Sequence, residues 1–197
     1  MGTTITFIII IAVILAASVI GYRRHQRYAR WEKLHKRFAT RRSLKLNFIH
    51  QNDFQFYGSY RDYKVNIKPE LIDEQLFSAF TVEMINPNRK ALRISKKHEN
   101  FPSLDQKAII DNPFPIKHDI GKWLVMQTND LMFSSLVLSD DIRISLHEIF
   151  SVYDAALLYI YDEELSLLIP KTLDREEEIS LYEKALEVLC DIKDELN

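Results

Sequence analysis

An almost uninterrupted run of apolar residues, Ile5 to Ile20, lies near the start of this 197-residue chain. No side chain from Thr3 to Tyr22 is charged. About 20 helical residues at roughly 1.5 Å per residue extend about 30 Å, which is the thickness of the hydrocarbon core of a bilayer. We therefore predict a transmembrane anchor over residues 1–22.

The charge on either side of the apolar run predicts its orientation. Between Arg23 and Lys45 the chain has ten Lys or Arg and one acid, Glu32, whereas Met1 to Thr4 contains no basic residue. The positive-inside rule keeps such a basic flank in the cytoplasm. We expect a single-pass protein of the cell membrane, with its N-terminus outside and its C-terminal domain in the cytoplasm.

A cleaved signal peptide is the alternative interpretation of the same run. Ala16-Ala17-Ser18 offers the small residues that a signal peptidase accepts. Signal peptides carry positive charge ahead of their apolar region, and here the positive charge follows it. The charge asymmetry therefore favours an uncleaved anchor.

The segment 23–43 is predicted to be a basic juxtamembrane helix, because it lacks Pro and Gly and repeats large apolar residues every three or four positions. It either continues the membrane helix or bends at Gly21, with Trp31 and Phe38 entering the membrane interface. Its basic side chains suit anionic lipid head groups, or they serve only as the topology signal. This basic collar comprises Arg23, Arg24, Arg27, Arg30, Lys33, Lys36, Arg37, Arg41 and Arg42.

The remainder, residues 44–197, is acidic and has the size of one domain. Outside the basic flank the chain has 16 basic and 27 acidic residues. Such a body is repelled by phosphates, so we expect no nucleic acid partner. The single Cys190 cannot form an intramolecular disulfide, as expected in a reducing compartment.

Alternating apolar residues predict a hairpin over 54–67, a third strand that ends near Asn86 and a fourth at Leu92 and Ile94, which together form a four-strand meander. Gly58 within the first strand suggests a bulge or a close backbone approach. Further strands are predicted at 123–127, 155–161 and 165–169.

Two short helices are predicted between these strands, one capped by Asn129 or Asp130 and one that begins after Ser139. Asp174, followed by Glu177, predicts the start of a C-terminal amphipathic helix. The predicted fold class is therefore α+β: an N-terminal transmembrane helix, a basic helix, and a mainly antiparallel sheet with two short helices and a terminal helix packed on it.

The pattern is lost between residues 98 and 122, where three prolines occur and a short strand at 107–110 is possible by pattern alone. Pro113, Phe114, Pro115 and Ile116 combine loop geometry with apolar side chains, so they form a candidate loop for a protein partner. The alternative is that Phe114 and Ile116 fold back and cap the core.

Two segments of the body stand out: Phe56-Tyr57-Gly58-Ser59-Tyr60-Arg61-Asp62-Tyr63-Lys64-Val65, and Leu158-Tyr159-Ile160-Tyr161-Asp162-Glu163-Glu164-Leu165 ahead of an amphipathic helix. Through these segments the layout resembles an uncharacterised domain of bacterial single-pass membrane proteins. The resemblance covers most of the body, and it implies the fold and the tether but no established activity.

No catalytic or cofactor motif is recognisable. The body contains only Gly58 and Gly121, whereas loops that cradle phosphates need several glycines. Cys190 lies in an amphipathic helix and is interpreted as a packed thiol. Acids follow three histidines, but adjacent residues point in different directions and make poor metal ligands: His98-Glu99, His118-Asp119 and His147-Glu148. We therefore expect no catalytic residue, cofactor or metal.

These observations support three functional hypotheses. The first is a non-enzymatic protein-interaction or scaffold module with an unknown protein partner, held at the membrane. The second is an anionic-lipid sensor that works through the basic collar. The third is an unrecognised hydrolase, which would require the His and Asp candidates to converge in one pocket.

Overall fold

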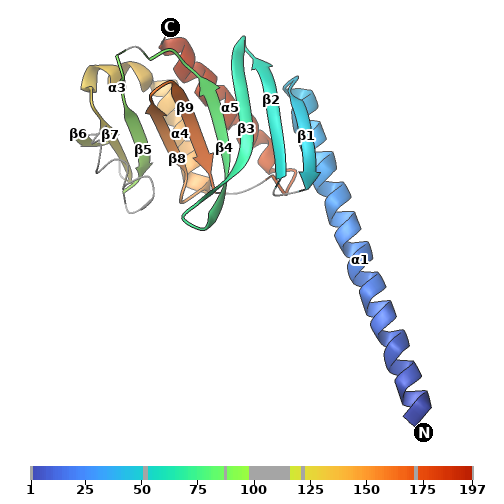
Figure 1. Ribbon diagram of the computed structural model, residues 1–197. Helices are drawn as coiled ribbons and strands as arrows, with labels where there is room; N and C mark the ends of the chain where they lie inside the picture. Colours follow the sequence, from blue (N-terminus) through green and yellow to red (C-terminus); the bar gives the residue numbers. More distant parts are fainter. Residues whose placement is uncertain are drawn as a thin grey trace.

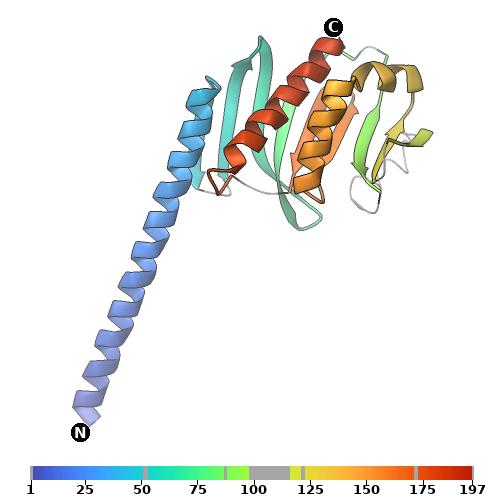
Figure 2. The same cartoon turned by 180° about the vertical axis from the view of Figure 1, so that it is seen from behind.

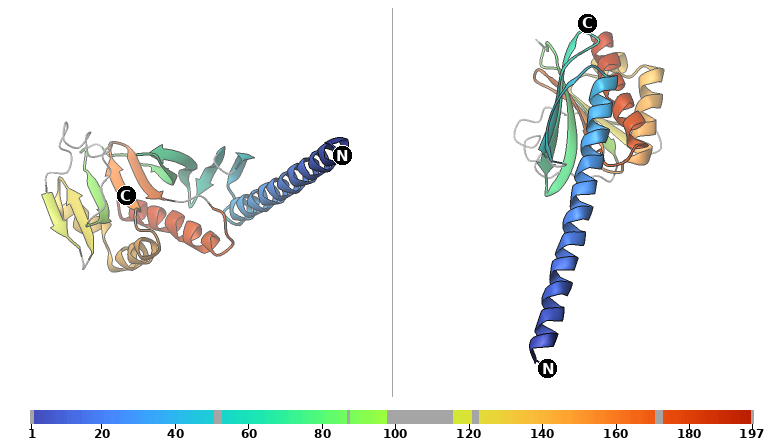
Figure 3. Two further views of the ribbon diagram at one scale, coloured as in Figure 1. Left: turned by 90° about the horizontal axis from the view of Figure 1, so that it is seen from below. Right: turned by 90° about the vertical axis from the view of Figure 1, so that its right-hand side faces the viewer.

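The computed structural model describes residues 2–50, 53–86, 88–97, 116–120, 123–170 and 173–196, without the side chains of 2–10, 12 and 118. A twisted sheet forms one layer, and the helices cover a single face of it (Figure 1; Figure 3, right). All strand pairs in the described part of the chain are antiparallel. The predicted α+β class with a mainly antiparallel sheet is confirmed.

The described helices are α1 (Gly2–Arg41), α3 (Leu131–Val137), α4 (Asp140–Val152) and α5 (Glu178–Glu195). The strands are β1 (Lys45–His50), β2 (Asp53–Tyr60), β3 (Tyr63–Ile72), β4 (Gln75–Glu83), β5 (Leu92–Lys96), β6 (Ile116–Asp119), β7 (Leu124–Thr128), β8 (Leu157–Tyr161) and β9 (Glu164–Ile169). Their order in the sheet is β1-β2-β3-β4-β9-β8-β5-β7-β6.

The predicted anchor and basic helix are one continuous helix, α1, which passes through Gly21 without a break. Its N-terminal half projects from the domain, and its C-terminal end runs beside β1 (Figures 1 and 2). No helix of the described residues combines the length and the apolar character that crossing a membrane requires. The structure does not describe the side chains of residues 5–10 and 12, which belong to the apolar run.

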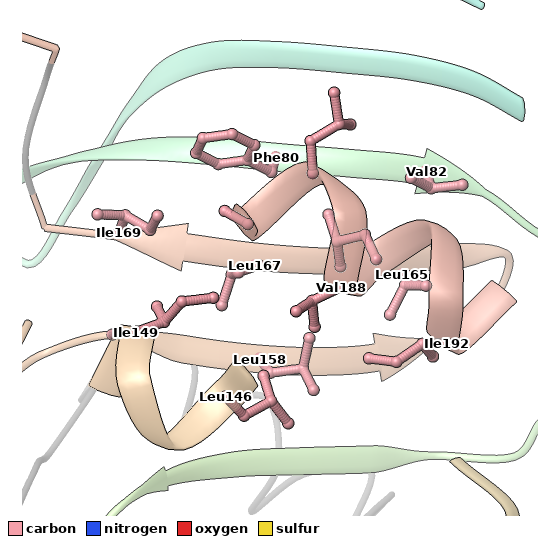
Figure 4. Packing of buried hydrophobic residues seen from close by; sticks show 14 of the residues in the cluster. Phe80, Val82, Leu146, Ile149, Leu158, Leu165, Leu167, Ile169, Val188 and Ile192 are labelled. Carbon is pink, nitrogen blue, oxygen red and sulfur yellow. The ribbon is translucent and has the colours of Figure 1, made fainter. Parts of the chain in front are cut away.

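The core lies between the sheet and the pair α4 and α5. On β4, Phe80 and Val82 pair with Leu167 and Leu165 of β9, and all four side chains are fully buried. Figure 4 shows this layer meeting the helices, where apolar side chains repeat at helical spacing. The helical residues labelled there are Leu146, Ile149, Val188 and Ile192.

The predicted four-strand meander is wrong in its last strand. The meander consists of β1 to β4, and β5 lies across the sheet between β8 and β7. The hairpin of β8 and β9 fills the gap between β4 and β5, because both of its strands are apolar on both faces and need neighbours on each side. We also missed β1, and β6, which lies within the segment where the pattern is lost.

The helix starts agree well with the sequence. Asp130 caps α3 by accepting hydrogen bonds from the backbone N–H groups of Met132 and Phe133. The predicted apolar face of α4 is its buried face, formed by Ile142, Leu146, Ile149 and Phe150. The start of α5 differs from the prediction in one respect.

The carboxylate that reaches back at the start of α5 belongs to Glu178 and not to Glu177. Its Oε2 atom accepts hydrogen bonds from the backbone N–H groups of Asp174 and Arg175, at 3.0 and 3.1 Å. Glu178 is buried, whereas Glu177 is exposed, so only Glu178 points toward those groups. The capping carboxylate lies one residue later than predicted, because residues 175–177 form a turn and the helix begins at Glu178.

Gly58 is explained by its backbone conformation and not by the predicted close approach. Its φ is +147°, and a Cβ atom there would lie 3.6 Å from Leu44 Cδ2, at ordinary contact distance. The unusual φ, more than the space, therefore favours glycine at this position. Leu44 thereby packs over β2, directly after α1 ends.

Two hairpin loops in this glycine-poor chain hold ordinary residues in the left-handed conformation. Asp73 and Glu74 join β3 to β4 with φ of 48° and 65°, and the flanking Ile72 and Gln75 are paired. Positive φ at both loop residues is the geometry of a type I′ turn, in which glycine is favoured at the second position. The turn at Glu74 is therefore strained.

We predict that Glu74→Gly raises the free energy of unfolding by roughly 0.5–1 kcal/mol, because glycine adopts this φ without steric cost. Thermal and urea denaturation of the full chain, followed by circular dichroism, measures the change. Gln75→Gly, one residue further on in β4, is the matched control and should lower the stability by roughly 0.5–1 kcal/mol. Loss of stability in both variants would contradict the turn assignment.

Candidate functional site

The basic collar divides into two parts along α1. Toward the domain, Arg42 lies 2.8 Å from Glu187 and 3.3 Å from Glu183, and Arg41 lies 3.4 Å from Glu183. Arg37 pairs with Glu176. These three arginines therefore bind carboxylates of α5 and of the turn before it.

Closer to the apolar run the collar is open. Its side chains are exposed, and none of them forms an ion pair within the described part of the chain. These residues are Arg23, Arg24, Arg27, Arg30 and Lys33. Lys36, between the two parts, pairs with Glu32 at 2.6 Å. The collar residues closest to the predicted anchor are thus the ones available to a ligand.

The last turns of α1 belong to the core of the domain. Phe38 is fully buried, and its ring centroid lies 4.9 Å from that of Phe56 and 5.7 Å from that of Tyr182. The Tyr182 hydroxyl in turn hydrogen-bonds the buried Ser78. Phe38 therefore does not enter a membrane interface, and the packed body begins before the predicted boundary at residue 44.

His35 occupies an aromatic pocket one turn earlier. Its ring lies 4.7 to 5.5 Å from the rings of Phe48, Phe54 and Phe56. Nδ1 lies 2.8 Å from the carbonyl oxygen of Trp31, to which it donates, and Nε2 is buried without a partner in the described residues. Burial lowers the pKa of His35 to about 4, although the hydrogen bond to Trp31 opposes this shift. His35 is therefore neutral near pH 7.

A cleft of about 580 Å³ opens where α1 leaves the domain. One wall is α1, with Arg27, Arg30 and Trp31, and the other wall is the turn ahead of α5. The turn contributes Asp174, Arg175, Glu176 and Glu177. Figure 2 shows this turn beside α1, at the end of the domain from which the helix projects. Sequence reasoning missed the cleft, because its walls lie far apart in the chain.

A second surface lies at the opposite edge of the sheet, on α3. Three of its apolar side chains are exposed: Leu131 by 51%, Leu136 by 62% and Met132 by 80%. A cleft of about 530 Å³ adjoins this surface, between α3, α4 and the β6–β7 hairpin, and its lining includes Ile120, Met126, Leu131 and Leu138. The α3 surface is therefore an apolar area with a neighbouring depression.

Of the predicted partner loop, only Ile116 is described; it begins β6 and is half-buried. Pro113, Phe114 and Pro115 lie outside the described residues, as do the possible strand at 107–110 and the His98-Glu99 pair. The side chain of His118 is also outside the description. The partner-loop prediction is therefore untested.

The remaining chemical candidates do not converge. His147 is exposed against Trp123, with ring centroids 4.4 Å apart, and Glu148 pairs with Lys184. Among the described residues, no group of three or more His, Cys, Asp or Glu could hold a metal ion. Cys190 is buried in α5, and burial raises the pKa of its thiol to about 12, which fits the predicted packed thiol.

No protein-family model and no curated protein matches this sequence. Among solved structures, the chain is similar to the crystal structure of the mycobacterial trehalose monomycolate transport factor A, TtfA, with a TM-score of 0.58 and 11% identity. The likeness covers 84% of this chain and 93% of that chain. At 11% identity this likeness concerns the fold alone. The resemblance to an uncharacterised domain of bacterial single-pass membrane proteins therefore stays a prediction.

We predict a pH dependence of stability from His35. The unfolded chain takes up a proton at His35 near pH 6.5, whereas the folded chain does so only near pH 4. Stability is therefore complete above about pH 6.5 and falls as the pH decreases toward 4, by up to about 3 kcal/mol. Urea denaturation of the full chain between pH 7 and pH 4 measures this loss.

His35→Gln, which stays neutral throughout, should remove most of this pH dependence. His147→Gln is the matched control, because His147 is exposed and outside the aromatic pocket. The difference between the two variants separates His35 from carboxylates that titrate in the same range. Equal pH slopes in both variants would mean that His35 does not drive the change.

Proposed function

We propose that this chain is a single-pass membrane-anchored protein whose domain binds another protein and does not catalyse a reaction. One observation carries the anchor: six large apolar side chains of α1 are 46–61% exposed and lie away from the domain (Figure 1). They are Ile11, Val13, Ile14, Leu15, Val19 and Ile20. Burying each is worth about 1.5–3 kcal/mol, so together they favour an apolar surrounding by on the order of 10 kcal/mol.

The orientation in this proposal follows from the charges that flank the apolar run. The open part of the collar begins directly after it, at Arg23, and the N-terminal side has no basic residue. The positive-inside rule then places the domain in the cytoplasm and the N-terminus outside. Arg23 and Arg24 would lie beside anionic head groups, where each contributes about 1 kcal/mol.

The binding role is supported by the shape of the domain. Its described side chains form no convergent catalytic cluster, whereas α3 presents exposed apolar residues at the edge of the sheet farthest from α1 (Figure 1). Clustered exposed apolar side chains are typical of interaction surfaces. The structurally similar protein TtfA is a trehalose monomycolate transport factor, which is compatible with a module that assists a membrane complex. We propose that an apolar segment of a protein partner covers Met132 and Leu136.

The anionic-lipid sensor is the second function that an observation favours. The open part of the collar contains five cations without an ion pair in the described part of the chain, whereas Arg37, Arg41 and Arg42 bind acids of the domain. A sensing role would therefore depend on the residues nearest the bilayer. A hydrolase has no comparable support, because His147 and the aspartates of α4 are exposed and dispersed.

The anchor predicts a definite labelling pattern. Cys190 is buried and its thiol pKa is about 12, so the native chain should not react with maleimides. In intact spheroplasts, a membrane-impermeant maleimide should label Thr3→Cys and leave Ser151→Cys unlabelled until the cells are broken. Labelling of Ser151→Cys in intact cells would reverse the orientation. Release of the chain from membranes by alkaline carbonate would contradict the anchor itself.

The interaction role predicts a partner that depends on α3. Gentle solubilisation of membranes should recover the full chain with a protein that is lost from the Met132→Ser/Leu136→Ser variant, because apolar contact area is removed. Ile144→Ser on α4 is the matched control, since Ile144 is also exposed, by 59%. A photo-crosslinking residue at position 132 should capture the same protein. A partner that binds the α3 variant and the native chain equally would contradict this surface.

A further inference from the structure

We infer that the cleft between α1 and the turn ahead of α5 binds the head group of a zwitterionic aminophospholipid, a phosphoethanolamine. This inference rests on the proposed membrane anchor for its source of ligand. It begins from the two walls of the cleft, which carry opposite charges. Arg27 and Arg30 project from α1, and the opposite wall is rich in carboxylates.

The charges in the cleft differ in whether they already have partners. Glu176 pairs with Arg37, and Arg175 lies 3.9 Å from Asp174. The side chains of Arg27, Arg30 and Glu177 form no ion pair or hydrogen bond within the described part of the chain. The lining of the cleft therefore includes two cations and one carboxylate that have no charged partner among the described residues.

The cleft begins at the outer edge of the head-group layer. Arg27 to Trp31 follow Tyr22, the last residue of the uncharged run, by five to nine positions, or about 7 to 14 Å of helix. The polar layer on each side of a bilayer is about 5 to 7 Å thick. Long arginine side chains bridge the remaining distance by bending back toward the interface. A lipid head group can thus reach the cleft without leaving the bilayer.

The paired charges select the chemistry of the ligand. A phosphodiester accepts hydrogen bonds from the guanidinium groups of Arg27 and Arg30. A purely anionic head group would leave Glu177 facing a like charge, whereas the primary ammonium of ethanolamine can donate to its carboxylate. A choline group has no N–H to donate. Trp31 adds an aromatic face that attracts a cation.

Trp31 also provides a direct reporter of binding. The chain has two tryptophans, and Trp123 lies far from the cleft, beside His147. In the full-length Trp123→Phe variant in nonionic detergent, Trp31 is the sole tryptophan. Adding soluble glycerophosphoethanolamine should change its fluorescence saturably and protect it from acrylamide quenching. This measurement needs no bilayer, so it separates the head-group site from the anchor.

The variants test the two walls separately. Arg27→Gln/Arg30→Gln should weaken binding about tenfold or more, and Glu177→Gln about tenfold, because each removes charge-assisted hydrogen bonds. Arg23→Gln/Arg24→Gln removes the same charge outside the cleft and should leave binding within about twofold. Equal weakening by both arginine pairs would overturn the site and indicate general charge attraction.

The ligand series tests selectivity. Glycerophosphoethanolamine should bind more tightly than glycerophosphocholine, glycerophosphoglycerol or inorganic phosphate. A response to glycerophosphoglycerol or phosphate that equals the ethanolamine response would overturn the zwitterionic assignment, and no response to any head group would overturn the site. In liposomes, phosphatidylethanolamine should protect Trp31 more than phosphatidylglycerol does. Selectivity in detergent together with failure to insert into liposomes would contradict the anchor but keep the site.

Discussion

The arrangement of this molecule depends on how the last turns of α1 dock on the domain. Phe38 enters the core between Phe56 and Tyr182, and His35 fills the aromatic pocket formed by β1 and β2. Burial of these two side chains fixes the C-terminal end of α1 against the sheet. Because α1 continues without a break through Gly21, this contact also sets the direction of the rest of the helix. The direction of the projecting half is therefore set by contacts inside the domain.

The same docking explains why the basic collar is not uniform. Once Phe38 is buried, the neighbouring Arg37, Arg41 and Arg42 come to lie against α5 and the turn before it, where acids meet them. The cations nearer the N-terminus of α1 stay exposed and form no ion pair among the described residues. Part of the basic flank therefore forms ion pairs with the acidic body inside the fold.

Local features of the fold could be predicted from the sequence, and long-range ones could not. Asp130 caps α3, and the buried face of α4 consists of Ile142, Leu146, Ile149 and Phe150. Both features were predictable because each depends on residues only a few positions apart in the sequence. The placement of β5 between β7 and β8 depends on which strand edges remain unpaired. The alternation of apolar and polar residues within a strand does not give this information. At the site, the collar arginines were predictable from charge, whereas their acidic partners lie more than 130 residues further along the chain.

The cleft follows from the meeting of two elements that the fold brings together. Arg27, Arg30 and Trp31 lie about two to three turns before Phe38 on α1. The segment 174–177 leads directly into α5, whose Tyr182 contacts Phe38. One aromatic contact thus places both walls, so the distance between them varies little while α1 remains docked. Because α1 also carries the apolar run, the cleft and the proposed anchor lie on one continuous helix. In a bilayer that holds the apolar run, the cleft therefore stays at a constant distance from the lipid head groups. This linkage raises the effective concentration of head groups at the cleft above that of a solute from the bulk.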